Sequence, residues 1–312
     1  MKPEMIFLIA AAVAVFLLIL YMSASYAAFR FAFLRRKRQG RNAPLYETPR
    51  LAPYLGRIRS AIEAANTRPY ECVRITSHDG LSLAARLYDT KDATVTVLLF
   101  HGYRSFPEYD FGCFLSYYLD ECGYRVLMVD ERAHGESEGK YITFGALERK
   151  DCVLWAHYAA ERFGGKLVLD GMSMGAATVL LASAEPLPRE VVAVLADSAY
   201  ASAEEILCHV GRGMHLPVGM LMPGVRVICR TLAHFDLRAT DVPAAIRKTK
   251  LPILLVHGES DTFVPFEMGK KNAALLSPNA FVSIPDADHG MGYLVDPVRV
   301  TDAVSAFFGR VL

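Results

Sequence analysis

Residues 166–183 read K-L-V-L-D-G-M-S-M-G-A-A-T-V-L-L-A-S, which is an apolar run of strand length, a serine between glycines and a run of small residues typical of a helix. Gly171 to Gly175 form a G-x-S-x-G pentapeptide centred on Ser173. A serine on a sharp strand-to-helix turn adopts strained backbone angles, and the flanking glycines let neighbouring backbone approach without Cβ clashes. The pentapeptide alone fits a helix-capping serine in a glycine-rich turn equally well. Its interpretation therefore depends on the partners that the rest of the chain supplies.

A nucleophilic serine needs an imidazole base, and the imidazole needs a carboxylate that holds it in the right tautomer. In doubly wound hydrolases these groups follow the serine in the order acid, then histidine. Here the apolar run Ile253–Val256 leads into H-G-E-S-D-T-F-V-P with Asp261, and Ala280–Ile284 leads into P-D-A-D-H-G-M-G with His289. Both residues follow expected strands, and catalytic groups gather at the carboxyl ends of parallel strands. Asp288 is a competing acid, but it adjoins the histidine too closely to orient its ring, so Asp261 is favoured.

An oxyanion hole is the remaining requirement, because acyl transfer needs N–H donors aimed at the developing negative charge. One donor would be the backbone N–H of Met174, the residue after the serine. The other should come from the loop after an early strand. That loop is H-G-Y-R-S, following V-T-V-L-L-F, and its expected donor is the backbone N–H of Tyr103.

The remaining chain alternates strand-length apolar runs with stretches of helical spacing. This alternation predicts a mostly parallel, doubly wound sheet with helices on both faces. Residues 200–250 interrupt the alternation and are rich in Gly, Met, His and Pro, which predicts a small inserted cap. The expected strands are Cys72–Ile75, Leu81–Tyr88, Thr94–Phe100, Arg125–Val129, Lys166–Leu169, Val191–Leu195, Ile253–Val256 and Ala280–Ile284.

The amino-terminal segment has a different composition from the rest of the chain. From Met5 to Phe29 there is no charged residue, and a helix needs roughly 20 apolar residues to span a bilayer. We expect an uncleaved transmembrane anchor at 1–29, a basic linker with a short helix at 30–69 and one catalytic domain at 70–312. A cleaved signal peptide is the main alternative, with small residues near Ser25 for a peptidase, but only one basic residue precedes the apolar run. A buried core helix is disfavoured because the run has no polar face.

Charge is distributed unevenly along the chain. The formal net charge is only +1, which gives no reason to expect a nucleic-acid partner. Residues 1–44 nevertheless carry seven Lys/Arg and one acidic residue, and five of the basic residues fall in 35–41. By the positive-inside rule this flank stays cytoplasmic, which predicts a single-pass protein of the cell membrane with a cytoplasmic catalytic domain. The six scattered cysteines fit a reducing compartment and form no metal-binding motif.

Taken together, these motifs resemble the α/β-hydrolase superfamily. The strings are V-L-L-F-H-G-Y, G-Y-R-V-L-M-V-D-E-R-A-H-G-E-S-E-G, G-M-S-M-G, P-I-L-L-V-H-G-E-S-D-T-F-V-P and A-D-H-G. The resemblance extends over about 70–312. Within the superfamily, the chain is most similar to the serine aminopeptidase/monoglyceride-lipase-like group, including its membrane-anchored bacterial members. It implies an α/β-hydrolase fold. Residue by residue it places Ser173, Asp261 and His289 on the catalytic triad, and Tyr103 and Met174 on the oxyanion donors. Glu131 and Ala133 depart from the group's usual D-x-R-G-H-G loop.

The expected reaction is acyl transfer to water, with no cofactor. A small-molecule or lipid-like ester is the favoured substrate because alkoxides leave more readily than amines. A serine peptidase with the same triad is an alternative, with Glu204 and Glu205 as weak candidates for binding a substrate amine. A non-catalytic tethered protein of the same fold is another. The apolar stretch 213–224 could hold an acyl chain, rest on the bilayer or serve as ordinary cap core.

Overall fold

One eight-stranded sheet lies at the centre of the computed structural model, which describes residues 2–36 and 48–312. The strand order is β1-β2-β4-β3-β5-β6-β7-β8, in which β2 runs antiparallel to both its neighbours and all remaining pairs are parallel. The expected doubly wound α/β class is confirmed, and every expected strand is present. The strands are β1 (Glu71–Thr76), β2 (Ser82–Tyr88), β3 (Val95–Phe100), β4 (Arg125–Asp130), β5 (Lys166–Met172), β6 (Val191–Asp197), β7 (Ile253–Gly258) and β8 (Phe281–Ile284).

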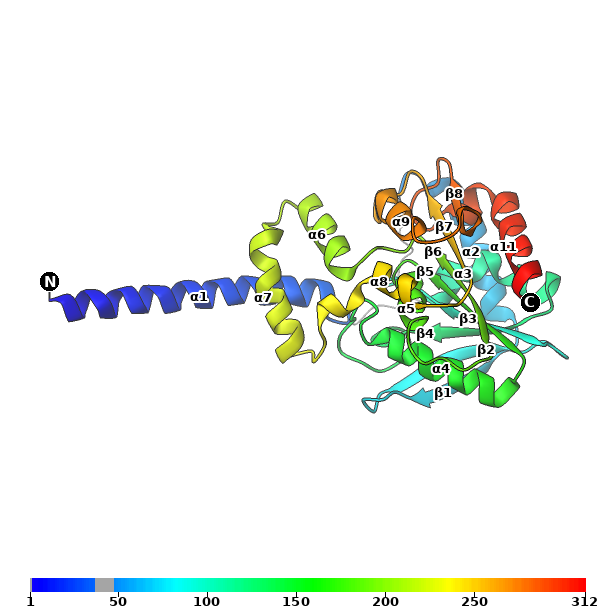
Figure 1. Cartoon of the computed structure of the whole chain (residues 1–312), viewed down its shortest axis with the longest axis horizontal. Helices are drawn as coiled ribbons and strands as arrows, with labels where there is room; N and C mark the ends of the chain where they lie inside the picture. The colour runs from blue at the N-terminus through cyan, green and yellow to red at the C-terminus, as the bar shows by residue number, and fades with distance from the viewer. Residues whose placement is uncertain (1, 37–47) are drawn as a thin grey trace.

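Helices cover both faces of this sheet (Figure 1). The central strands are buried on both sides, so their side chains alternate between two apolar clusters. Leu98 of β3 packs in the cluster that contains α4 and α5, whereas Leu99 packs in the cluster of α2, α3 and α11. The helices are α1 (Pro3–Phe33), α2 (Leu55–Thr67), α3 (Pro107–Ser116), α4 (Glu148–Phe163), α5 (Met174–Ala182), α6 (Ala203–Gly213), α7 (Val218–Thr231), α8 (Val242–Lys248), α9 (Phe266–Ala273), α10 (Gly292–Val295) and α11 (Pro297–Val311).

The segment between β6 and β7 forms the insertion that the sequence led us to expect. It contains α6, α7, the short 3-10 helix Leu237–Thr240 and α8. Figure 1 shows α6 and α7 at the end of the body from which α1 projects. The insertion therefore lies between the sheet and the free part of α1.

Helix α1 has two parts with different surroundings. An 18-residue apolar window of this helix has a mean hydropathy of 2.9, and none of its residues is buried. Its length and composition are those of a membrane span. Farther along, Ser25, Phe29 and Phe33 are buried in the body. The ring of Phe33 lies 5.3 Å from that of Phe144, between centroids, and 5.8 Å from that of Phe235. The end of the helix is thus part of the hydrophobic core.

The basic flank after α1 is partly built into the body as well. The Arg35 guanidinium donates to the backbone carbonyls of Gly135 and Ser137, each at 2.6 Å. Three members of the expected basic cluster, Lys37, Arg38 and Arg41, lie outside the described residues.

Replacing Phe33 with alanine tests whether the end of α1 belongs to the core. The buried ring is lost and a cavity remains, so Phe33→Ala should lower the free energy of unfolding by about 3–5 kcal/mol. Urea unfolding of the full chain in detergent measures this. Phe16→Ala, on the free part of the same helix with its side chain 59% exposed, should change it by less than about 0.5 kcal/mol. Equal effects of the two substitutions would show that α1 does not pack on the body.

Candidate active site

Ser173 occupies a sharp turn between β5 and α5. Its backbone has φ 56° and ψ −110°, a strained region for a residue with a side chain. The flanking glycines permit this turn. A Cβ on Gly175 would lie 1.8 Å from the carbonyl oxygen of Phe100, and one on Gly171 would lie 2.3 Å from the backbone of Gly175. The G-x-S-x-G motif therefore has the strand–turn–helix context that a nucleophile elbow requires.

The structure brings Ser173, His289 and Asp261 together in one chain of hydrogen bonds. Ser173 Oγ lies 2.9 Å from His289 Nε2, and His289 Nδ1 lies 2.7 Å from Asp261 Oδ2. The loop after β7 supplies the acid, and the loop after β8 supplies the histidine. Asp288, the competing acid, instead accepts from the backbone N–H groups of Thr262 and His289 itself.

The Asp261 carboxylate is held by the loop that carries it. Its Oδ1 accepts from the backbone N–H groups of Phe263 and Val264, at 2.9 and 2.8 Å. His257 Nε2 lies 3.3 Å from Oδ2. Burial disfavours the charged carboxylate, but the imidazoles of His289 and His257 outweigh it and keep the pKa of Asp261 below its usual range.

His289 is affected by the same two opposing influences. Burial disfavours its charged form, whereas the adjacent Asp261 carboxylate stabilises it, and the net effect raises the pKa of His289 above its ordinary value of 6.5. Because Nδ1 faces a carboxylate, the neutral ring carries its proton there. Nε2 is then free to accept a proton from Ser173.

The loop that carries Tyr103 lies against the serine. A Cβ on Gly102 would lie 3.3 Å from the Cβ of Ser173. The amides on either side of Tyr103 are held within the protein, since Gly102 N–H donates to Asp110 Oδ2 at 2.6 Å and Arg104 N–H to His134 Nε2 at 3.0 Å. Met174 is the first residue of α5, where backbone N–H groups have no acceptor within the helix. The two expected oxyanion donors thus border the serine from two sides.

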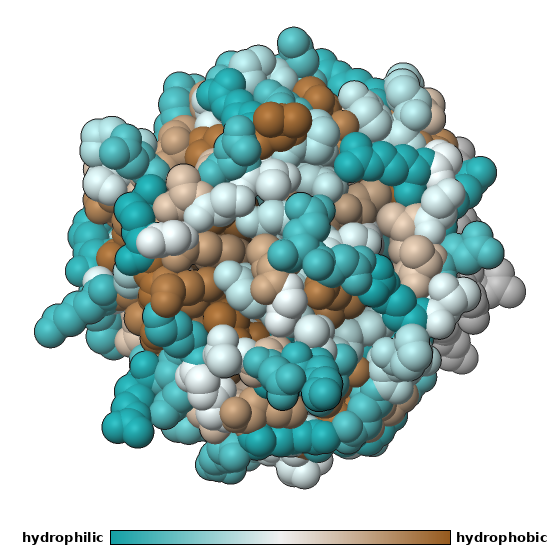
Figure 2. Space-filling model, turned by 90° about the vertical axis from the view of Figure 1, so that its right-hand side faces the viewer, coloured by the Kyte–Doolittle hydropathy of each residue, from teal (hydrophilic) through white to brown (hydrophobic). Residues whose placement is uncertain are grey.

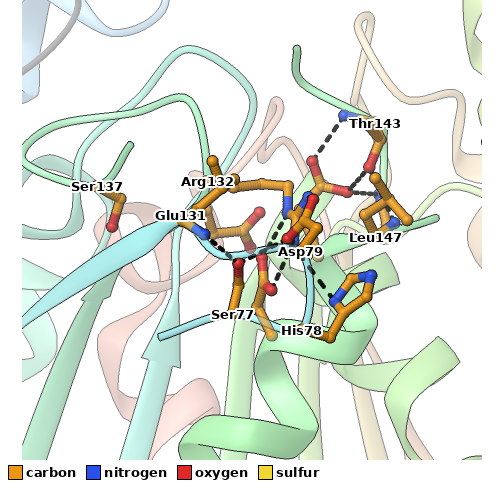
Figure 3. Close-up of polar contacts among 12 residues, drawn as sticks. Ser77, His78, Asp79, Glu131, Arg132, Ser137, Thr143 and Leu147 are labelled. Carbon is orange, nitrogen blue, oxygen red and sulfur yellow. Dashed lines mark hydrogen bonds and ion pairs between the residues drawn. The ribbon is translucent and has the colours of Figure 1, made fainter. Parts of the chain in front are cut away.

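Ion pairs of Arg132 support the neighbouring loop after β4, which contacts the Tyr103 loop through His134. Arg132, in the loop after β4, is paired with Asp151 at 2.5 Å and with Asp79 at 2.9 Å (Figure 3). The same loop carries His134, which accepts the Arg104 amide and whose ring centroid lies 4.8 Å from that of His101. These two histidines therefore contact backbone rather than the serine.

The chain is similar to known proteins in sequence and in fold. Residues 91–235 match the family described as serine aminopeptidase, S33. The chain is 26% identical over 260 residues to the bifunctional esterase/perhydrolase DCH of Acinetobacter calcoaceticus, covering 70% of this chain and 92% of that protein. It is 27% identical over 184 residues to YqkD of Bacillus subtilis, covering 58% and 60%. The solved structure of the Pyrococcus furiosus esterase Pf2001 superposes with a TM-score of 0.63 at 23% identity, covering 88% of this chain and 97% of that one.

The chain has the α/β-hydrolase fold. The match to the serine aminopeptidase family begins shortly before β3 and ends within the insertion, so it contains the turn of Ser173 and the loop of Tyr103. The strands that carry Asp261 and His289 lie beyond it.

Ser173 of this α/β-hydrolase lies on the wall of a cavity of about 530 Å³. The cavity extends along the face of the sheet that α3 and α11 cover. Among the described residues, α6 and α7 contribute nothing to its wall. Most of the lining is apolar and includes Phe106, Phe111, Phe114, Met291, Val300 and Val304.

The sequence reasoning did not place three carboxyl groups that also line this cavity, Asp110, Asp170 and Asp197. Burial raises the pKa of Asp110 to about 6 and that of Asp170 to about 7, and it also raises the pKa of Asp197. Tyr118 donates to Asp170 at 2.7 Å. Asp170 directly precedes the elbow and Asp197 ends a strand, so their positions offered a signal, whereas Asp110 lies in no recognisable motif.

Adding a methyl group at Gly175 tests the close contact on which the elbow depends. In Gly175→Ala the new Cβ must displace the Phe100 carbonyl, and we expect a loss of about 1–3 kcal/mol in the free energy of unfolding, or failure to fold. Thermal unfolding measures this. Gly309→Ala is the control, because its Cβ meets nothing within 4 Å in α11, and it should stabilise by about 0.5–1 kcal/mol. Similar stability of both variants would contradict the elbow geometry.

Proposed function

We propose that this α/β-hydrolase is a membrane-anchored serine esterase that transfers the acyl group of a carboxylic ester to water. The observation that carries the proposal is the hydrogen-bonded series Ser173–His289–Asp261 on the wall of an apolar cavity. An esterase/perhydrolase among the relatives and an esterase among the structural neighbours support it. Ser173, His289 and Asp261 are the proposed triad.

The proposed reaction begins when Ser173 Oγ attacks the ester carbonyl carbon and His289 Nε2 takes its proton. The carbonyl oxygen becomes an oxyanion that the backbone N–H groups of Tyr103 and Met174 stabilise. Collapse of this intermediate breaks the C–O bond to the alcohol, which leaves with the proton from His289. Water, deprotonated by His289, then attacks the acyl-serine, and the acid is released. Asp261 stays ionised throughout and orients the imidazole.

The membrane part of the proposal depends on α1. Its free apolar window is long enough to span a bilayer, and Ser25, near the site at which a signal peptidase would cut, is fully buried against the body. These features support an uncleaved anchor. We propose that the body lies on the cytoplasmic side, because the basic residues follow the apolar segment rather than precede it.

A fluorophosphonate probe and p-nitrophenyl esters of increasing chain length test the catalytic assignment. The full chain should react covalently with the probe and hydrolyse the esters. Ser173→Ala should abolish labelling, and both Ser173→Ala and His289→Ala should lower kcat by at least about 10⁴-fold. Failure of the unaltered chain to label would refute the proposal, and labelling that survives in Ser173→Ala would place the nucleophile elsewhere.

The pH dependence of ester hydrolysis tests the role of Asp261. Only neutral His289 can accept the serine proton, and since its pKa is raised above 6.5, activity should rise with pH through a midpoint above 6.5. Asp261→Asn removes the charge that favours the imidazolium. The midpoint of kcat/KM should therefore move to lower pH, and kcat should fall about 10⁴-fold. An unchanged midpoint would mean that Asp261 does not interact with the base.

A peptidase with the same triad is the second candidate function, and the three cavity carboxyl groups favour it because they could bind a substrate amine. Glu204 and Glu205, the residues first considered for this, are instead paired with Arg226 and Lys271, both at 2.9 Å. Aminoacyl p-nitroanilides, run beside the esters, distinguish the two functions.

A further inference from the structure

An apolar stripe on the cap faces outward. Met220 is 66% exposed and Val227 50%, and Met214 and Leu216 in the preceding turn are also exposed. Met220, Pro223 and Val227 are three and four residues apart, so they share one face of α7. We call these five residues the cap stripe. Met222, Val225 and Cys229, on the opposite face of α7, are buried in the core. The stripe is therefore not needed to hold the cap together.

The cap stripe also does not serve the cavity. The described residues that line the cavity around Ser173 lie mainly on α3, α10, α11 and the loops beside them, and none belongs to the stripe. Of the three roles considered for residues 213–224, the structure does not support binding of an acyl chain in this cavity. The buried residues of 213–224 form part of the core. The exposed ones have no partner in the described chain that explains their apolar character.

Helix α1 indicates what covers the stripe. A Cβ on Gly224 of α7 would lie 2.3 Å from Ser25 Oγ and 3.1 Å from Tyr21 Oη, so α7 crosses α1 at this level. At 1.5 Å per residue, the segment from Met5 to Ser25 is about 30 Å long, which equals the thickness of the hydrocarbon layer. When this segment spans a bilayer, the crossing point lies at the bilayer surface.

The orientation of α7 agrees with a position at the bilayer surface. Figure 1 shows α7 lying across α1 at the end of the body nearest its free part. Because the buried face of α7 points into the body, the cap stripe points away from it, toward the free part of α1. The opposite end of the molecule shows mostly hydrophilic side chains, with apolar side chains in several areas between them (Figure 2). Tyr21 and Tyr26 lie at the same level as the crossing, where amphipathic rings favour the headgroup region.

We propose that the cap stripe inserts into the interface of the bilayer that α1 spans, so that the hydrolase domain is docked on the lipid surface rather than suspended from its anchor. The proposal rests on the membrane anchor of the proposed function, and it gives the protein a second contact with the bilayer besides α1. Burial of exposed Met, Leu and Val side chains in the acyl–headgroup boundary supplies the driving force.

Photocrosslinking to lipid tests this contact. p-Benzoylphenylalanine is placed at Met220 or Val227 of the full chain, which is then reconstituted into vesicles of phosphatidylcholine and phosphatidylglycerol, irradiated and analysed by mass spectrometry for lipid adducts. Val13 in the free part of α1 is the positive control. Val298 is the matched negative control, because it is 67% exposed and belongs to α11, which Figure 1 shows on the side of the body away from α1.

We expect lipid adducts at positions 13, 220 and 227 and at least tenfold fewer at 298. Adducts at 13, with no more at 220 and 227 than at 298, would overturn the docking and leave the anchor intact. Absence of adducts at 13 would overturn both. Hydrolysis of a soluble p-nitrophenyl ester by the same preparations reports the catalytic assignment separately.

Introducing charge into the stripe provides a second measurement that does not depend on the yield at the altered site. With the crosslinker at Leu216, the double substitution Met220→Glu/Val227→Glu should reduce lipid adducts several-fold, because two carboxylates resist transfer into the interface. Val298→Glu should leave the yield unchanged. Circular dichroism confirms that the double variant is folded, and an undiminished yield in the folded variant would contradict the proposal.

Discussion

The backbone of Gly175 lies against the carbonyl group of Phe100 so closely that no side-chain atom fits between them. This contact joins the start of α5 to the end of β3, and most of the site depends on it. It brings the loop after β3, with Gly102 and Tyr103, beside Ser173. It also holds the serine in a positive-φ conformation whose cost, of order 1–3 kcal/mol, the surrounding packing must offset.

Hydrogen bonds and ion pairs behind the site hold the loops that surround it. The loop after β4 is fixed by the Arg132 guanidinium between two carboxylates, and its His134 receives the amide of Arg104. Arg104 in turn donates from its side chain to the carbonyl of Phe31 in the last turn of α1, and Tyr103 donates to that of Ala32 at 2.7 Å. The loop that carries Tyr103 is therefore held from the sheet on one side and from α1 on the other.

Much of the fold and of the candidate site could be predicted from the sequence, because the relevant constraints are local. Strands buried on both faces must be apolar throughout, and the elbow needs glycine on both sides of Ser173. The order of Asp261 and His289 after strand ends follows from the parallel sheet. The packing of Phe29 and Phe33 on the body could not be predicted, since a lipid-facing and a core-facing phenylalanine look alike in an apolar run. Nor could the carboxyl group of Asp110 in the cavity, which depends on the approach of α3 to the sheet.

Helix α1 continues without a break from its free apolar part into the core of the body, where Phe29 and Phe33 are buried. Such a helix has no joint that could absorb rotation. In a bilayer, transmembrane helices tilt to match the hydrocarbon thickness. If α1 spans a bilayer as proposed, any tilt of α1 is passed on to the whole body as a rigid rotation, so the thickness of the membrane would determine the angle at which the cavity faces the lipid.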